Sequence, residues 1–211
     1  MLPEKRAILL SIRPEWCKKI LSGEKTVEIR KSCPAHGTPF KVYIYCTLAG
    51  SDSLFVDALN RDVAAWNRGG WPEKKGRVIG EFTCDKIDKL VHVGTMMDIN
   101  ILTLDGWYKS AGELLQAACL TEAAAKKYLQ GRNGYGWHIS DLKIYDQPRK
   151  LTGFLPNCRF GKDGECEYRR VYCEHQNYDY NQDGSVNVVC CDKRVQKAPQ
   201  SWCYVEELAE G

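Results

Sequence analysis

Apolar residues along the first 85 positions follow the periods of strands. The continuous apolar run 7–12 is typical of a strand buried on both faces. The segment 26–30 alternates β-branched with polar residues, as a half-buried strand does. The runs 41–47 and 76–84 have the same strand character. The first part of the chain is therefore predicted to contain four strands.

Helical spacing occurs in three places between and after these strands. Pro14 suits the first position of a helix, and apolar residues then recur every three to four positions until Gly23. A second helix is predicted from 54 to 66. The segment 113–129 has helical periodicity but is predicted to form two short helices, the second beginning at the N-cap Thr121.

The end of the chain divides into three parts. Strands are predicted at 134–140, 142–145 and 201–205, whereas 155–193 is poor in aliphatic residues and rich in Cys, Gly, Asn, Asp and Tyr. We therefore predict an α+β protein, a small mixed or antiparallel β-barrel with packed helices and a late, loop-rich insertion. The predicted divisions are a main domain over 1–154, the insertion over 155–193, and 194–211 completing the main domain.

Composition and charge exclude several classes of protein. The 211 residues are 44% hydrophobic and 27% charged, which is ordinary for a globular chain and excludes a disordered tail, a collagen or a coiled coil. No apolar run approaches the roughly 18 residues of a membrane span. The start lacks the pattern of a secretion signal, so we expect a cytoplasmic protein and, without further evidence, a monomer. The net charge of +3 is too small for a protein that coats duplexes.

Cysteine is the anomaly of the composition, with 11 residues of which six fall in the last 54 positions. A cluster of cysteines in a reducing compartment indicates a metal site more than a set of disulfides. Asp183-Gly184 between two alternating runs predicts a hairpin that brings Cys190 and Cys191 back beside Cys173. Adjacent strand residues point to opposite faces, so Cys191 is favoured as the ligand.

These features predict a closed, structural zinc site of four thiolates. The ligands would be Cys158, Cys166, Cys173 and Cys191. His175 is a substitute ligand. The alternatives are a reduced loop with unpaired thiols, disulfides, and a calcium loop over 179–184, which lacks the carboxylate expected at its twelfth position.

The segment Gly23-Glu24-Lys25-Thr26-Val27-Glu28-Ile29-Arg30 places two cations and an acid close together. Glu28 and Arg30 share one face of the predicted strand, and Lys25 lies at its entrance, where it can join them. Arg30 can fork onto a phosphate, Lys25 supplies a point charge, and Glu28 can orient either one or accept from a base amino group. The alternative is an ion-pair ladder on the surface of a strand.

The same segment matches the G-x-K-x-x-E-x-R signature, and the chain is similar to the ASCH domain family of PUA-like β-barrels. The entry 10–16 and the closing segment 198–205 resemble bacterial and phage members. The resemblance implies a cleft beside the signature strand and a role in binding RNA or a modified nucleoside. Some members are similar to amidohydrolases of acetylated cytidine, with a Thr nucleophile where this chain has Glu28, and others are nucleases.

Several further residues are candidates for the same site. Arg13 precedes Pro14, where the chain must be extended, so its side chain can point over the strand edge. Aromatic rings that stack on bases are typical of single-strand binders. The candidates for such a wall are Trp137, His138, Trp202 and Tyr204, with Ser201 beside them. Each is also a candidate for the core or its rim, and Trp137 and His138 cannot both face inward.

Three functions are compatible with these residues. The leading prediction is binding of RNA or a nucleotide-like ligand beside Lys25, Glu28 and Arg30. The second is an enzyme, a nucleoside amidohydrolase or a ribonuclease, with Lys25 as base and Glu28 beside it. The third is an accessory factor that binds a protein partner through the zinc hairpin. The sequence predicts no organic cofactor.

Overall fold

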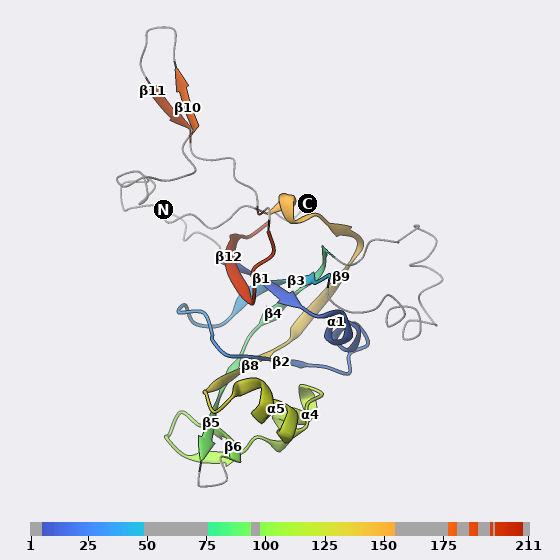
Figure 1. The fold of residues 1–211 in the computed structure, drawn as a ribbon, viewed down its shortest axis with the longest axis vertical. Coiled ribbons are helices and arrows are strands. Elements are labelled where there is room, and N and C mark those ends of the chain that lie inside the picture. Colours follow the sequence, from blue (N-terminus) through green and yellow to red (C-terminus); the bar gives the residue numbers. More distant parts are fainter. Residues whose placement is uncertain are drawn as a thin grey trace.

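The computed structural model describes residues 6–48, 76–93, 98–154, 177–180, 186–189, 195 and 197–208. Their strands form two five-stranded sheets and a separate two-stranded hairpin (Figure 1). The α+β class predicted from the sequence is confirmed. The described strands are divided between two sheets and do not close into one barrel. None of the described helices has the length and apolar character needed to cross a membrane.

The first sheet has β1 near its centre and the end of the chain at its edge. Its order is β12 (Trp202–Glu206), β1 (Arg6–Ile12), β3 (Phe40–Cys46), β4 (Arg77–Cys84) and β9 (Ser140–Arg149). The β1–β3 pair is parallel and the other pairs are antiparallel. Every residue of β1 after Arg6 is buried, which explains its continuous apolar run.

The second sheet carries the signature strand at one edge. Its order is β2 (Val27–Arg30), β8 (Gly134–His138), β5 (Ile87–Val93), β6 (Asp98–Leu102) and β7 (Tyr108–Ser110), with all pairs antiparallel. At two short corners the chain passes directly from one sheet to the other, from β4 to β5 through 85–86 and from β8 to β9 through Ile139. The two sheets therefore enclose a shared core.

Three α-helices within the described residues pack against this framework. The helix α1 (Pro14–Leu21) follows β1 directly, and Arg13 before it is extended as predicted, with ψ of 149°. The helices α4 (Gly112–Ala117) and α5 (Glu122–Leu129) cover one face of the second sheet. Thr121 caps α5, since its side chain accepts a hydrogen bond of 3.2 Å from the Ala124 amide.

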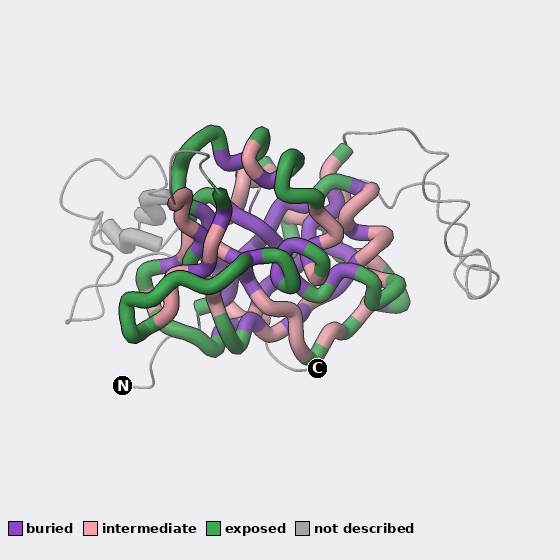
Figure 2. The backbone as a smooth tube through the Cα atoms, turned by 90° about the horizontal axis from the view of Figure 1, so that it is seen from below, coloured by how far each residue is buried: buried purple, intermediate pink, exposed green. Residues whose placement is uncertain are grey.

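Buried residues lie through the centre of the molecule, as Figure 2 shows. The main cluster joins Ile8, Leu10, Val42 and Phe82 of the first sheet to Trp137 of β8. A second cluster lies between the second sheet and the helices α4 and α5. The signature strand β2 contributes Val27 and Ile29 to this second cluster, and all four of its residues are buried.

The predicted elements are found within a few residues wherever the structure describes them. The break near residue 121 and the hairpin are confirmed, and β10 (Asn177–Tyr180) pairs antiparallel with β11 (Val186–Val189). A short 3₁₀ helix, Leu151–Gly153, was not predicted, nor were β5, β6 and β7. The predicted helix 54–66 lies outside the described residues. The same holds for the proposed zinc ligands Cys158, Cys166, Cys173 and Cys191 and for His175.

Candidate functional site

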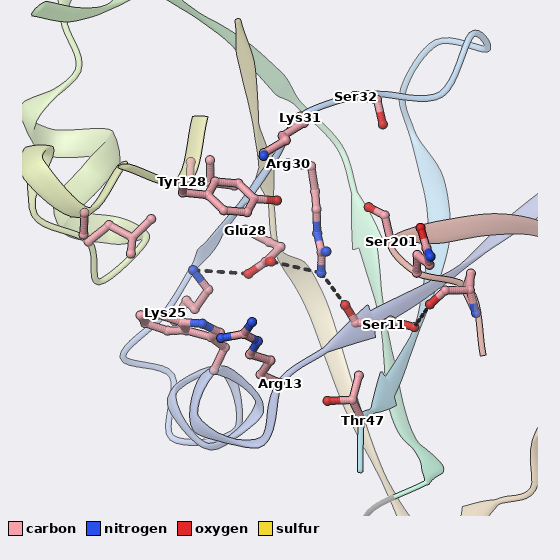
Figure 3. Close-up of a pocket in the computed structure, with 16 residues that line it drawn as sticks. Ser11, Arg13, Lys25, Glu28, Arg30, Lys31, Ser32, Thr47, Tyr128 and Ser201 are labelled. Atoms are coloured by element: carbon pink, nitrogen blue, oxygen red, sulfur yellow. Dashed lines mark hydrogen bonds and ion pairs between the residues drawn. The ribbon is translucent and has the colours of Figure 1, made fainter. Parts of the chain in front are cut away.

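A cavity of about 870 Å³ lies along the free edge of β2. Its walls come from the end of β1, the start of α1, the strand β2, the helix α5 and residues 199–201 (Figure 3). These segments are far apart in the sequence. The fold brings them together because β1 leads directly into α1 and because α4 and α5 pack on the sheet that β2 borders.

Lys25, Glu28 and Arg30 form a chain of two ion pairs on one wall of this cavity (Figure 3). Lys25 Nζ lies 3.2 Å from one oxygen of the Glu28 carboxylate, and an Arg30 terminal nitrogen lies 3.1 Å from the other. The three residues are 2%, 7% and 7% exposed. The structure therefore brings the three signature side chains together, and it buries them instead of leaving them on a solvated strand surface.

Backbone carbonyl groups hold both cations in place. Lys25 Nζ donates to the Ala118 carbonyl at 2.7 Å, and Arg30 donates to the Ser11 carbonyl at 2.6 Å. Lys25 itself precedes β2, and the Thr26 amide after it bonds the Ala117 carbonyl. Because Lys25 lies in the turn before β2, its side chain does not follow the alternation of the strand and can lie beside Glu28. The Lys25 ammonium also lies 5.0 Å from the centre of the Trp16 ring.

Positive charge exceeds negative charge around the cavity. Among its described lining residues, Arg13, Lys25, Arg30 and Lys31 are cationic and Glu28 is the one carboxylate. Arg13 lies at the rim with its side chain 71% exposed. The buried Nε of Arg30 has no hydrogen-bond partner in the structure. A buried donor without a partner is costly unless a ligand or water meets it, so the wall is suited to an acceptor-rich anion.

Two aromatic residues that the sequence analysis missed line the same cavity, Trp16 of α1 and Tyr128 of α5. Burial raises the pKa of the Tyr128 phenol, although the positive charge of Arg30 acts in the opposite direction. Lys31 Nζ lies 5.0 Å from the centre of the Tyr128 ring. Helical spacing placed both residues on helices, but it carries no information on which cavity a helix borders.

The predicted Ser201 lines the cavity together with Ser11. The Ser11 amide donates to the Ser201 carbonyl at 2.9 Å, and the Ser11 hydroxyl donates to the Pro199 carbonyl at 2.7 Å. These bonds attach the segment after residue 197 to the end of β1. The closing segment of the chain therefore forms one wall of the site.

The four residues of the predicted aromatic wall, Trp137, His138, Trp202 and Tyr204, do not line this cavity. Trp137 is fully buried between the sheets, where the apolar interior takes the largest ring. Trp202 donates to the Ser32 hydroxyl at 3.0 Å, and the Tyr204 hydroxyl accepts from the Ala35 amide at 3.1 Å. His138 faces away from Trp137, as alternation requires, and pairs with an acid of β5.

That acid is Asp88, whose carboxylate lies 2.7 Å from His138 Nε2 and 2.9 Å from Lys86 Nζ. Burial acts to raise the pKa of Asp88, but the hydrogen bonds from His138 and Lys86 outweigh it and hold that pKa below its usual value. The pair lies on β5 and β8, outside the lining of the cavity. Among the described residues, no group of three or more His, Cys, Asp or Glu is placed to hold a metal ion.

Comparison with known proteins finds a local similarity in sequence and a set of similar structures. No family model matches the chain. A segment of 46 residues is 37% identical to an ASCH domain-containing ribonuclease of Zymomonas mobilis. The resemblance to the ASCH family is confirmed. The aligned segment makes up 22% of this chain and 31% of the relative, so it spans about a third of that ASCH protein.

Solved ASCH structures from Zymomonas mobilis are also similar to this chain. The crystal structure of the ASCH protein has a TM-score of 0.47 and 18% identity, covering 94% of this chain and 86% of its own. A serine-to-alanine mutant of that ASCH protein has a TM-score of 0.46 and 18% identity, covering 96% and 90%.

Proposed function

We propose that this ASCH-type protein binds RNA, or a nucleotide-like part of one, in the cavity beside Lys25, Glu28 and Arg30. The observation that carries the proposal is the buried Arg30, which lines the cavity with an unpartnered Nε. Its guanidinium is planar and matches the two oxygens of a phosphate. The excess of cations around the cavity suits the same ligand.

Each wall of the cavity has a distinct part in this proposal. Lys25 supplies a fixed positive charge, since the Ala118 carbonyl and Glu28 hold its ammonium. Glu28 orients both cations and has the chemistry to accept a hydrogen bond from a base amino group. The rings of Trp16 and Tyr128 offer faces on which a base can stack. RNA recognition commonly combines such stacking with phosphate contacts.

Binding is expected to weaken as salt rises, with one contribution from the rim residue Arg13. Each phosphate contact to a single strand contributes about −0.7 to the slope of log affinity against log salt concentration. Four cations around the cavity predict a slope no steeper than about −3. Replacing Arg13 by alanine should make the slope shallower by about 0.7. Fluorescence anisotropy of a labelled RNA oligonucleotide, titrated from low to high KCl, measures this slope.

The exposed Lys143 of β9 provides the control, because it does not line the cavity. Lys143→Ala should leave the slope unchanged. A chain that retains no RNA even at low salt would contradict the proposal, and so would binding whose affinity does not change with salt.

A ribonuclease is the second candidate, and the name of the relative as a ribonuclease favours it. In this second proposal, Lys25 and Glu28 would move a proton at a bound ribose. General acid–base groups contribute about 10²-fold or more, so Lys25→Ala should lower the cleavage rate by about 10²-fold. The measurement is product formation from labelled RNA and from acetylated cytidine, with Lys143→Ala as control and circular dichroism to verify folding. The absence of turnover on the whole panel would remove the enzymatic candidate.

A further inference from the structure

The register of the second sheet aligns one row of residues from the cavity to the opposite edge. Arg30 of β2 lies opposite Tyr135 of β8, which lies opposite Lys89 of β5. Lys89 lies opposite Leu102 of β6, which lies opposite Tyr108 of β7. Directly opposed residues of antiparallel strands point to the same face. The row therefore follows one face of the sheet, beginning at a side chain of the cavity.

This face is open toward its far end. Tyr135 and Leu102 are half-buried, whereas Lys89 is exposed and Tyr108 is 58% exposed. The other face of the same strands is covered, because Leu90, Ile99 and Ile101 pack against α4 and α5.

The hairpin between β6 and β7 adds to this exposure. Leu104 is fully exposed and Trp107 is 76% exposed. Leu104, Trp107 and Tyr108 thus form a cluster of exposed large apolar side chains within five residues of one hairpin. A contiguous apolar patch of this kind typically indicates a binding surface, whereas single exposed apolar residues do not.

We propose that this row, named here the sheet track (Arg30, Tyr135, Lys89, Leu102 and Tyr108), guides single-stranded RNA from the cavity to the β6–β7 hairpin. The proposal rests on the proposed function, since it extends the ligand of the cavity. Strands lie about 4.8 Å apart, so the four steps from β2 to β7 span about 19 Å. At a stacked spacing of about 3.4 Å this is the length of some six nucleotides.

The chemistry of the sheet track favours a single strand of nucleic acid over an apolar partner. Tyr135 lies next to the cation of Lys89, and Tyr108 follows beyond Leu102, so the row combines aromatic faces with a positive charge, as single-strand binders do. The track is also continuous with Arg30, the residue proposed to hold a phosphate. A duplex is less suited to this surface, because its bases are stacked on one another and cannot stack on the tyrosine rings.

The test compares a short and a long ligand on the full chain. We expect wild-type protein to bind fluorescein-labelled octaadenylate more tightly than diadenylate, because only the longer one reaches β7. Tyr108→Ala should raise the Kd of octaadenylate by about 5- to 100-fold and leave the Kd of diadenylate unchanged. Tyr108→Phe keeps the stacking face and should restore wild-type affinity. Lys89→Ala should make the salt slope for octaadenylate shallower by about 0.7.

The outcomes separate this inference from the proposed function. Tyr108 and Lys89 are exposed, so their variants are expected to fold, and Lys143→Ala on the other sheet is the matched control. If diadenylate binds but octaadenylate binds no more tightly, or if Tyr108→Ala binds it as wild type does, the sheet track is refuted and the cavity proposal stands. If wild-type protein binds neither ligand, the cavity proposal fails and the sheet track fails with it.

Discussion

Replacing Glu28 by alanine is expected to lower the free energy of unfolding by about 3–5 kcal/mol. The Glu28 carboxylate lies between Lys25 Nζ at 3.2 Å and an Arg30 nitrogen at 3.1 Å, and all three side chains are at most 9% exposed. Without it, two cations would remain buried side by side with no counter-charge. Urea unfolding followed by intrinsic fluorescence at neutral pH measures the change.

A second glutamate close in the sequence gives the control. Glu24 pairs with Lys19 at the surface, where water already solvates both charges, so Glu24→Ala should change the unfolding free energy very little. Equal effects of Glu28→Ala and Glu24→Ala would mean that the three signature side chains are not buried together in solution.

Stability alone does not account for this arrangement of charges. Taking one carboxylate and two cations out of water costs free energy that their mutual attraction offsets only in part, and apolar residues of similar size often stabilise a fold at least as well. Here the ion pairs form one wall of a cavity, and Arg30 keeps a donor without a partner. Buried charge clusters at a cavity are typical of functional sites. The cost of burying these charges, together with their position at a cavity, supports a ligand-binding role for the cluster.

The sequence was sufficient to predict those elements that are specified by neighbouring residues alone. The run 7–12 became a strand buried on both faces, and Pro14 marks the first residue of α1. The Thr121 cap was predictable because a hydroxyl followed by an alanine-rich helical segment is a local signal. The side chains of Glu28 and Arg30 on β2 lie together, as the alternation of a strand requires.

The strands β5 to β7 were missed because their burial is uneven. The helices α4 and α5 cover only one face of these strands, and only Leu90 of β5 is fully buried. Their other face bears polar and half-exposed residues, so the apolar alternation is weak in the sequence. Pairing with β8, which lies more than forty residues later, is what fixes β5 as a strand.

The walls of the cavity were predictable only in part for the same reason. Lys25, Glu28 and Arg30 are neighbours in the sequence, so their meeting depends on one turn and one strand. Trp16 and Tyr128 reach the cavity only through the packing of α1 and α5 around β2, which no local pattern specifies. The zinc site stays a prediction, since its cysteines lie outside the described residues.

Replacing Trp137 by alanine is expected to cost about 3–5 kcal/mol of unfolding free energy while leaving RNA affinity unchanged in the folded protein. Its ring is fully buried, with the centroid 5.6 Å from that of Phe40 and 5.9 Å from that of Trp202. Truncation would open a large void between the two sheets, whereas the ring does not line the cavity. Urea unfolding measures the first effect, and anisotropy with a labelled RNA at low temperature measures the second.

Trp107→Ala is the control for Trp137→Ala, because it removes an exposed tryptophan that does not pack between the sheets. It is 76% exposed, so Trp107→Ala should change stability by no more than about 0.5 kcal/mol. If Trp137→Ala instead weakens RNA binding under conditions where the protein is folded, the core and the cavity are not independent, and the ring supports the site through Glu28, which lies opposite it on β2. If it destabilises no more than Trp107→Ala, the two sheets do not share the core described above. Truncation of a core ring should therefore change stability without changing affinity, because the core lies between the sheets and the cavity lies at the free edge of one of them.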